Sequence, residues 1–248
     1  MVSEVQDQQR FSKKIKPIAK PTINEEIIKE LVKIIGDKQW VSTDIEVLYN
    51  YSQDMGEQIA PTLYEVAVLP NSSEEVSQIV KLANKHKFPI TPYAAGANVG
   101  GLTLPHEGGL VMDFKRMNRC LQIDKENKNI VIEPGFTFGH LKKMFIKGGE
   151  LEGFRYTFPF APPYTSVLTN ALLNGLGSLG VLHGCANNLI SGIEVVLPTG
   201  EVVNIGQNAI NKGKYWIARE PLPDFTGIFI ATQGTMGIVT KMGLYVTE

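Results

Sequence analysis

The sequence predicts an α+β protein in which helices and strands are mixed along the chain. Amphipathic helical patterns occupy residues 24–36 and 72–88, and pairs of strand-like runs joined by polar turns occupy residues 120–135 and 190–206. Such hairpins are too frequent for a doubly wound parallel sheet. With 248 residues, the chain is long enough for one large domain or two small ones.

Composition and charge exclude several classes of function. A net charge of −1 argues against a general nucleic-acid or acidic-membrane surface, because such surfaces need surplus Lys and Arg. We interpret the local basic run Arg10–Pro21 as a solvated arm rather than a docking tail. No apolar run is long enough to span a bilayer, and no signal peptide is recognised, so a cytoplasmic location is expected. Cys120 and Cys185 form no CxxC pair, so neither a disulfide framework nor a metal site is expected.

The first half of the chain is predicted to alternate between helices and buried strands. Asn24 is expected to cap a helix that Gly36 ends. The run "YEVAVLP" (64–70) is a short strand, after which Ser72 and Glu75 form a capping box for the next helix. Pro89 ends that helix, and the strand "ITPYA" leads into a glycine-rich loop.

The second half is predicted to be richer in strands. "GLVMDF" (109–114) is followed by the hairpin "CLQIDKENKNIVIEPG", and then by a helix that Thr137 caps and Gly148 ends. A second hairpin, "ISGIEVVLPTGEVVNIG", turns at Pro198-Thr199-Gly200. The chain closes with a short helix, a tight turn and a final strand.

The loop Tyr93–Gly101, "YAAGANVGG", suggests a phosphate cradle. Its small residues allow backbone N–H groups to converge on phosphate oxygens. A turn in which glycine merely supplies a positive φ explains the loop equally well. The loop lacks the Lys of a Walker A motif, and "GLGSLG" at 175–180 has the GxGxxG spacing but follows a helix rather than a strand, so neither nucleotide motif is assigned.

The ordered series "PYAAGANVGG", "VIEPGFTFGHL", "TSVLTNALLNGLG", "SGIEVVLPTGEVV" and "ATQGTMGIVTKMGLYV" closely resembles the FAD-binding domain of the vanillyl-alcohol oxidase and p-cresol methylhydroxylase flavoprotein family. The resemblance covers about residues 61–248 and implies a PCMH-type fold, with FAD between two α+β subdomains of about 61–116 and 117–248. Residues 1–60 would then be an N-terminal arm and helical segment. The texture of "SVLTNALLNGLG" is closer to the phenol-oxidising branch than to the glycolate and D-lactate dehydrogenases.

The resemblance also implies a set of FAD-binding residues in five segments. The first loop would wrap the pyrophosphate, two residues would line the cleft, a third segment would lie along the flavin and ribityl part, a fourth would line the cofactor, and a final turn would meet the adenine. In that order, they are Ala94, Ala95, Gly96, Ala97, Asn98 and Val99; Pro134 and Gly135; Ser166, Val167 and Asn170, with Gly184, Ser191 and Gly192; and Gly237, Ile238 and Val239. Taken singly, Asn170 could instead cap a helix, and Ile238 and Val239 could be ordinary strand core.

The sequence departs from the family pattern at two chemically important places. Ala97 stands where one branch attaches FAD through His, and no Cys lies near "PFAPPYTSV", so the resemblance implies non-covalent FAD or a tether from outside this chain. An apolar residue near Ala161 stands where phenol oxidases carry an acidic residue beside the flavin. It cannot act as a base, so no catalytic residue is assigned. His183 falls where relatives often place a Tyr near the flavin, and we expect a structural role for it.

The resemblance implies an FAD-dependent oxidoreductase acting on an alcohol, a 2-hydroxy acid or a para-substituted phenol. The substrate domain of the family would follow Glu248, so we expect either a fragment or an enzyme whose substrate domain is a separate subunit. Electrons would pass to oxygen or to a cytochrome, quinone or iron–sulfur partner. The alternatives are a non-catalytic FAD-binding scaffold or electron-transfer module and, less favoured, a cell-wall-precursor reductase on the same fold.

Overall fold

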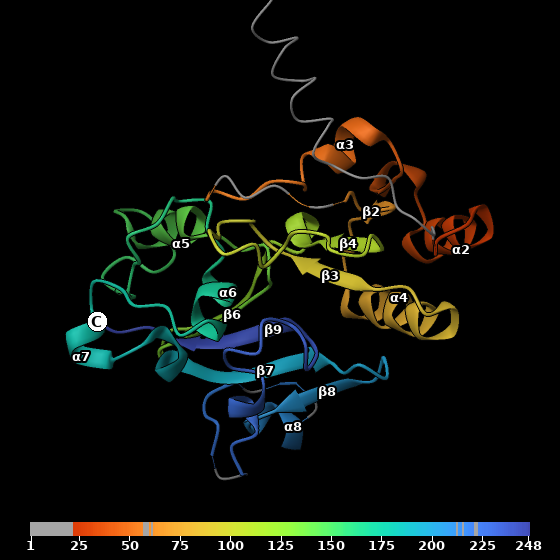
Figure 1. Cartoon of the computed structure of the whole chain (residues 1–248). Coiled ribbons are helices and arrows are strands. Elements are labelled where there is room, and N and C mark those ends of the chain that lie inside the picture. Colours follow the sequence, from red (N-terminus) through yellow and green to blue (C-terminus); the bar gives the residue numbers. More distant parts are fainter. Residues whose placement is uncertain (1–21, 57–59, 61, 212, 215, 221–222) are drawn as a thin grey trace, which may run out of the picture.

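The structure, a computed structural model, describes residues 22–56, 60, 62–211, 213–214, 216–220 and 223–248 (Figure 1). Two β-sheets organise these residues. The first sheet has the strand order β1 (Val41–Ser42), β2 (Val66–Val68), β4 (Leu110–Asp113), β3 (Ile90–Tyr93). The second has the order β5 (Cys120–Asp124), β6 (Asn129–Ile132), β9 (Ile238–Tyr245), β7 (Ile190–Val196), β8 (Val202–Ile205). The predicted α+β class is confirmed.

The first sheet is built around a β2–α4–β3 unit. Strands β2, β4 and β3 are parallel, and β1 pairs with β2 in the antiparallel direction. Helix α4 (Ser73–His86) begins at the predicted cap, where the Ser72 side chain accepts from the N–H of Glu75. The Glu75 carboxylate accepts from the N–H of Asn71 rather than from that of Ser72, so the reciprocal half of the capping box is displaced by one residue.

The segment before residue 61, which the sequence analysis separated from the FAD-binding domain, packs into the first sheet where it is described. Helix α2 (Glu25–Ile35) begins and ends at the predicted Asn24 and Gly36. Its buried residues Ile27 and Leu31 join a core with Val66 and Val68 of β2. The 3₁₀ segment η1 (Lys38–Trp40), β1 and helix α3 (Ile45–Tyr49) follow. The basic run Arg10–Pro21 lies outside the described residues.

The second sheet is antiparallel and contains both predicted hairpins, β5–β6 and β7–β8. The last strand, β9, lies at its centre, between β6 and β7. Helix α5 (Phe138–Phe145) is capped by Thr137 as predicted, but it ends at Phe145, before the predicted stop at Gly148. The remaining short helices are η2 (Phe114–Arg116), α6 (Val167–Leu172), α7 (Gly180–His183), η3 (Ala186–Leu189), α8 (Gln207–Ile210) and η4 (Thr226–Ile228).

Helix α4 joins the two sheets. Figure 1 shows it between the strands of the first sheet and the β7–β8 hairpin. The Ser73 hydroxyl donates to the buried Glu194 carboxylate of β7 at 2.5 Å, and the Asn84 amide donates to the carbonyl of Pro198 at 2.6 Å. These contacts fix the sheets relative to one another, so a site formed by both can be held in one geometry. In the described part of the chain, no helix is long and apolar enough to cross a membrane.

Candidate cofactor site

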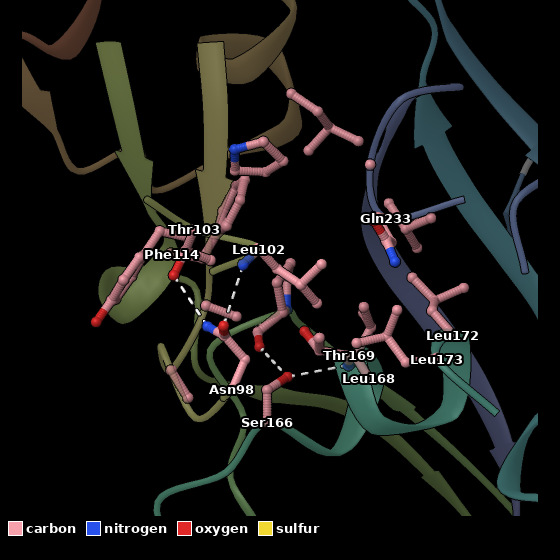
Figure 2. Close-up of a pocket in the computed structure, with 18 of the residues that line it drawn as sticks. Asn98, Leu102, Thr103, Phe114, Ser166, Leu168, Thr169, Leu172, Leu173 and Gln233 are labelled. Atoms are coloured by element: carbon pink, nitrogen blue, oxygen red, sulfur yellow. Dashed lines mark hydrogen bonds between the residues drawn. The ribbon is translucent and has the colours of Figure 1, made fainter. Parts of the chain in front are cut away.

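A pocket lies where the C-terminal end of β3 meets helix α6 and the start of β9 (Figure 2). Its walls come from both sheets. Figure 2 shows Asn98 and Leu102 on one side, Leu172, Leu173 and Gln233 on the other, and Ser166 at the base. The lining residues are Pro92–Asn98, Leu102, Thr103, Phe114, Pro134, Thr165, Ser166, Leu168, Thr169, Leu172, Leu173, Phe229, Thr232–Gly234 and Gly237–Val239.

The first wall is the glycine loop that follows β3. Asn98 organises this loop, because its amide oxygen accepts from the N–H of Leu102 at 3.1 Å and its amide nitrogen donates to the Thr103 hydroxyl at 3.0 Å. The Asn98 carbonyl accepts from the N–H of Met55 at 3.0 Å, and the Asp54 carboxylate accepts from the N–H of Gly101 at 2.8 Å. The Asn98 side chain is therefore committed to holding the loop.

Within that loop, three consecutive backbone donors are left over. Among the described residues, the N–H groups of Ala95, Gly96 and Ala97 donate to no acceptor. Backbone N–H groups that have no acceptor within the protein bond to water or to a ligand. Converging N–H groups on small residues form the type of concavity that binds phosphate oxygens. This loop is therefore suited to a diphosphate.

Gly96 is required in the loop for a steric reason. Its φ is +63°, and a Cβ added there would lie 2.0 Å from the Tyr93 hydroxyl oxygen. Tyr93 packs edge-on against Tyr51, with ring centroids 4.9 Å apart, and the Tyr51 hydroxyl donates to the buried Asp113 carboxylate at 2.8 Å. Burial, together with the nearby Asp113, raises the pKa of Tyr93. Tyr93 thus supports the loop as a neutral phenol.

Helix α6 supplies the opposite wall through one face. Leu168, Thr169 and Leu172 have the i, i+1, i+4 spacing of one helix face, and they line the pocket together with Thr165, which precedes the helix, and Leu173, which follows it. The face includes bulky apolar side chains, which can pack against an aromatic ring system and exclude water.

The third wall is the turn that precedes β9. Ala231 and Gln233 adopt φ values of +60° and +57°, which are uncommon for residues other than glycine and often mark functional sites. The N–H of Ala231 donates to the carbonyl of Leu172 at 2.7 Å, which fastens the turn to the end of α6. A Cβ on Gly234 would lie 2.8 Å from Pro92 of β3. The turn therefore closes the pocket against the first sheet.

The structure gathers many of the predicted site residues at this pocket. They are Ala94, Ala95, Gly96, Ala97, Asn98, Pro134, Ser166, Gly237, Ile238 and Val239. Ser166 takes part in the wall while its hydroxyl is used internally, donating to the carbonyl of Pro134 at 2.6 Å and accepting from the N–H of Thr169 at 3.1 Å.

The other predicted residues lie outside the pocket lining. Val99 is 66% exposed, whereas Val167 is fully buried in the core of the second sheet. Gly135 donates its N–H to the carbonyl of Met117 at 2.7 Å. Asn170 packs against Gly175, and Gly184, Ser191 and Gly192 belong to the α7–β7 region, where the Ser191 hydroxyl accepts from the Asn129 amide at 2.6 Å.

The pocket lining carries no ionisable acid or base other than Tyr93. Its described residues include no carboxylate, ammonium, guanidinium or imidazole group. Ala161 is exposed and His183 is half-buried, and neither lines the pocket. No group of three or more His, Cys, Asp or Glu within the described residues could hold a metal ion. The pocket can therefore bind and orient a ligand, but its walls supply no strong general base.

The shape and polarity of the pocket fit part of a flavin dinucleotide. The unpaired N–H groups suit its diphosphate, and the apolar face of α6 suits an aromatic ring. The cavity holds about 150 Å³. Small-molecule sites enclose roughly 300–1,000 Å³, so the described walls surround only part of a ligand of that size.

Comparison with known proteins decides the family. The sequence profile of a family described as "FAD binding domain" matches residues 64–206, which is more than half of the chain. The chain belongs to this family. The predictions of a PCMH-type FAD-binding fold and of FAD as the cofactor are thereby confirmed.

Two relatives that are named for different substrates have the same percentage of identical residues with this chain. Glycolate oxidase subunit GlcD of Bacillus subtilis is 29% identical over 222 residues, covering 88% of this chain and 44% of that protein. The 4-cresol dehydrogenase [hydroxylating] flavoprotein subunit of Pseudomonas putida is 29% identical over 234 residues, covering 93% and 44%. These identities do not favour the phenol-oxidising branch, to which the segment "SVLTNALLNGLG" was assigned.

Solved structures agree with this assignment. The structure of 4-ethylphenol oxidase from Gulosibacter chungangensis superposes with a TM-score of 0.77 at 26% identity, covering 89% of this chain and 42% of that one. The chain thus spans less than half the length of each of these relatives.

Proposed function

We propose that this chain is the FAD-binding part of a flavin-dependent oxidoreductase that oxidises an alcohol, a 2-hydroxy acid or a para-substituted phenol. The observation that carries the proposal is the set of three unpaired N–H groups at Ala95–Ala97, residues that line a pocket built from both sheets. Related proteins named for glycolate and cresol oxidation support the substrate range.

In this proposal, FAD supplies the acceptor for the hydride equivalent removed from the substrate. The glycine loop binds the diphosphate, and the apolar face of α6 orients the remainder and excludes water. Ala97 offers no side chain for covalent attachment. Neither Cys185 nor His183 lines the pocket. We therefore expect that no residue of this chain forms a covalent bond to FAD.

A second polypeptide is proposed to supply the substrate domain. The pocket walls provide no carboxylate or imidazole to accept a substrate proton, so such a group must come from elsewhere. No Asp, Glu, Lys or Arg occurs between Arg155 and Glu194, yet Phe160 and Val181 of this segment are 111% and 107% exposed. Depletion of charge with exposed apolar side chains is typical of the core of a protein interface.

An electron-acceptor protein is a further proposed partner. An iron–sulfur relay, if used, would belong to that protein, because no cysteine cluster among the described residues could hold such a centre. We also propose a cytoplasmic location. The absence of a strong base from the pocket favours one alternative function, a scaffold or electron-transfer module that holds FAD without turning over substrate.

The first test is an absorption spectrum of the purified protein before and after acid precipitation. A flavin spectrum whose colour stays in the supernatant is the expected result, and it indicates non-covalent FAD. Colour in the pellet would contradict the role given to Ala97. A colourless protein that also fails to bind added FAD would contradict cofactor binding by this chain alone.

A second test separates the oxidoreductase from the scaffold. The FAD-loaded protein, alone and with a candidate partner, is mixed anaerobically with glycolate, D-lactate or p-cresol, and loss of the long-wavelength flavin band is recorded. Bleaching that requires the partner supports the two-subunit enzyme. Bleaching without a partner contradicts the need for a second subunit, and no bleaching with a partner that binds favours the scaffold.

A further inference from the structure

A carboxylate from the N-terminal segment (residues 22–56) is bonded to the glycine loop. Asp54 uses one carboxylate oxygen to accept from the N–H of Gly101 at 2.8 Å, and the other to accept from the N–H of Gly56 at 2.9 Å. The first bond joins residues 47 positions apart, whereas the second is local. Because the family profile matches residues 64–206, the loop is held by a residue that precedes the matched region.

The next two residues of the segment contact the loop as well. The N–H of Met55 donates to the carbonyl of Asn98 at 3.0 Å. Gly56 approaches the loop so closely that an added Cβ would lie 2.7 Å from the carbonyl oxygen of Val99. The segment therefore holds the part of the loop that directly follows its three unpaired N–H groups.

The segment is itself anchored to the first sheet just before Asp54. The Tyr51 hydroxyl donates to the buried Asp113 carboxylate at 2.8 Å, and the Tyr51 ring packs edge-on against Tyr93, which begins the loop. Ser52 is fully buried. The Asp54 carboxylate thus extends from a backbone that is already fixed, so it can restrain the loop without first having to be ordered itself.

The negative charge of Asp54 is unexpected on a loop suited to a diphosphate. Like charges repel, so a carboxylate favours diphosphate binding only through what it does to the loop. Hydrogen bonds from backbone N–H groups to an ionised carboxylate are strong. Such a bond raises the fraction of molecules in which the loop has its binding conformation, and the apparent affinity for a ligand rises with that fraction.

We propose that Asp54 is a positioning residue for the cofactor, because it fixes the glycine loop so that the N–H groups of Ala95–Ala97 bind the diphosphate of FAD. The inference rests on the proposed function. Asp54 acts through the loop and not by touching FAD. The N-terminal segment is then part of the cofactor site rather than a separate arm.

The test compares Asp54→Ala, Asp54→Asn and Asp37→Ala in the full chain. Asp37 is the matched control, because this exposed residue of the same segment also accepts from a backbone N–H two residues later, that of Gln39 at 3.0 Å. We expect Asp54→Ala to weaken FAD binding about 3- to 10-fold, a loss limited by the remaining bond from Met55 to the loop. Asp54→Asn keeps one accepting oxygen and should lose less, whereas Asp37→Ala should bind like the wild type.

Two further readouts separate positioning of the loop from a general loss of stability. In the FAD-free protein, amide hydrogen exchange of the glycine loop is expected to be faster in Asp54→Ala and unchanged in Asp37→Ala. With FAD at saturating concentration, the phosphorus NMR resonances of its diphosphate are expected to shift in Asp54→Ala and not in Asp37→Ala.

Unchanged FAD affinity in Asp54→Ala would overturn the proposal. Tighter binding by Asp54→Asn would overturn it too, since that result is expected if the negative charge only repels the diphosphate. Weaker binding with unchanged hydrogen exchange in the loop and unchanged phosphorus resonances would show a general effect and overturn it equally. If the wild type binds no FAD while exchange in its loop still depends on Asp54, the proposed function fails and the restraint of the loop stands.

Discussion

Gly96 is the residue on which the geometry of the glycine loop (Tyr93–Gly101) depends most directly. For Gly96→Ala, we expect at least a tenfold weaker affinity for FAD and a loss of about 1–2 kcal/mol of unfolding free energy in the FAD-free protein. The added Cβ meets the Tyr93 hydroxyl at 2.0 Å, and φ is +63°, so the loop must move and carry its N–H groups with it. Fluorescence titration with FAD and chemical denaturation measure the two effects.

Gly100 provides a matched control in the same loop. A Cβ there meets no atom within 4 Å, and its φ lies outside the left-handed range. Gly100→Ala is therefore expected to bind FAD as the wild type does. If both variants lose affinity equally, general stiffening of the loop rather than the Gly96 contact controls binding.

Tyr156 gives a prediction about pH. Burial raises the pKa of its phenol, so above about pH 10 the unfolded chain loses this proton while the folded protein keeps it. The contribution of Tyr156 to stability is thus present below about pH 10 and declines by about 1.4 kcal/mol per pH unit above it. Tyr156→Phe is expected to remove that decline and to raise the unfolding free energy at pH 7 by about 1 kcal/mol, because the buried hydroxyl has no partner.

Urea denaturation between pH 7 and pH 11 checks this expectation. Tyr164→Phe, which changes an exposed tyrosine, is the control and should follow the wild-type curve. Identical pH slopes for Tyr156→Phe and the wild type would show that the Tyr156 phenol ionises equally in both states.

At the scale of elements, α4 is attached to the second sheet through Glu194. The Glu194 carboxylate accepts from Ser73 of α4 at 2.5 Å, from Thr240 at 2.9 Å and from the Lys241 ammonium at 3.0 Å. Glu194→Ala is expected to lower the unfolding free energy by about 2–4 kcal/mol, because two buried hydroxyls and a partly buried ammonium lose their acceptor. Chemical denaturation measures this loss.

Glu201 is the matched control, since it is an exposed carboxylate on the neighbouring β7–β8 turn. Glu201→Ala should change the unfolding free energy by no more than about 0.5 kcal/mol. A loss for Glu194→Ala as small as this would mean that apolar packing alone holds α4 against the second sheet.

The sequence predicts helix ends well where one side chain determines them. Asn24, Ser72 and Thr137 each cap a helix as expected, since their side chains accept from a backbone N–H three residues later. The end of α5 was less predictable. The chain leaves the helix after Phe145 through extended backbone at Ile146, and the signal at Gly148 marks a later positive φ of +83°.

The site is only partly readable from the sequence. The first glycine loop can be found from the sequence because its candidate binding groups are the backbone N–H groups of its own small residues. The pocket face of α6 was missed, although the spacing of Leu168, Thr169 and Leu172 is that of one helix face. The same spacing is also typical of a helix face that packs into the hydrophobic core. Only the packing of α6 in the folded protein shows which of its faces lines the pocket.

At the scale of the whole molecule, FAD is expected to stabilise both sheets together, because its pocket takes walls from each. At a free FAD concentration 100 times the dissociation constant, the unfolding free energy should rise by about 2.7 kcal/mol, and removing FAD should reverse the gain. The chain has two tryptophans that report separately on the two sheets. Trp40 packs against the core of the first sheet, and Trp216 lies against Gly243 of β9.

The variants Trp40→Phe and Trp216→Phe therefore each leave one fluorescent reporter. Equal FAD-induced shifts in their denaturation midpoints are the expected result. A shift seen by one reporter alone would show that FAD binds mainly to one sheet and that the two unfold independently.

The central position of β9 has a consequence for how the protein is made. During synthesis, the hairpins β5–β6 and β7–β8 leave the ribosome before the strand that must lie between β6 and β7. Isolated two-stranded ribbons are marginally stable in water. The second sheet can therefore close only after the residues of β9 have left the ribosome. Because Ile238 and Val239 at the start of β9 also line the pocket, the pocket walls are complete only after β9 has been synthesised and paired.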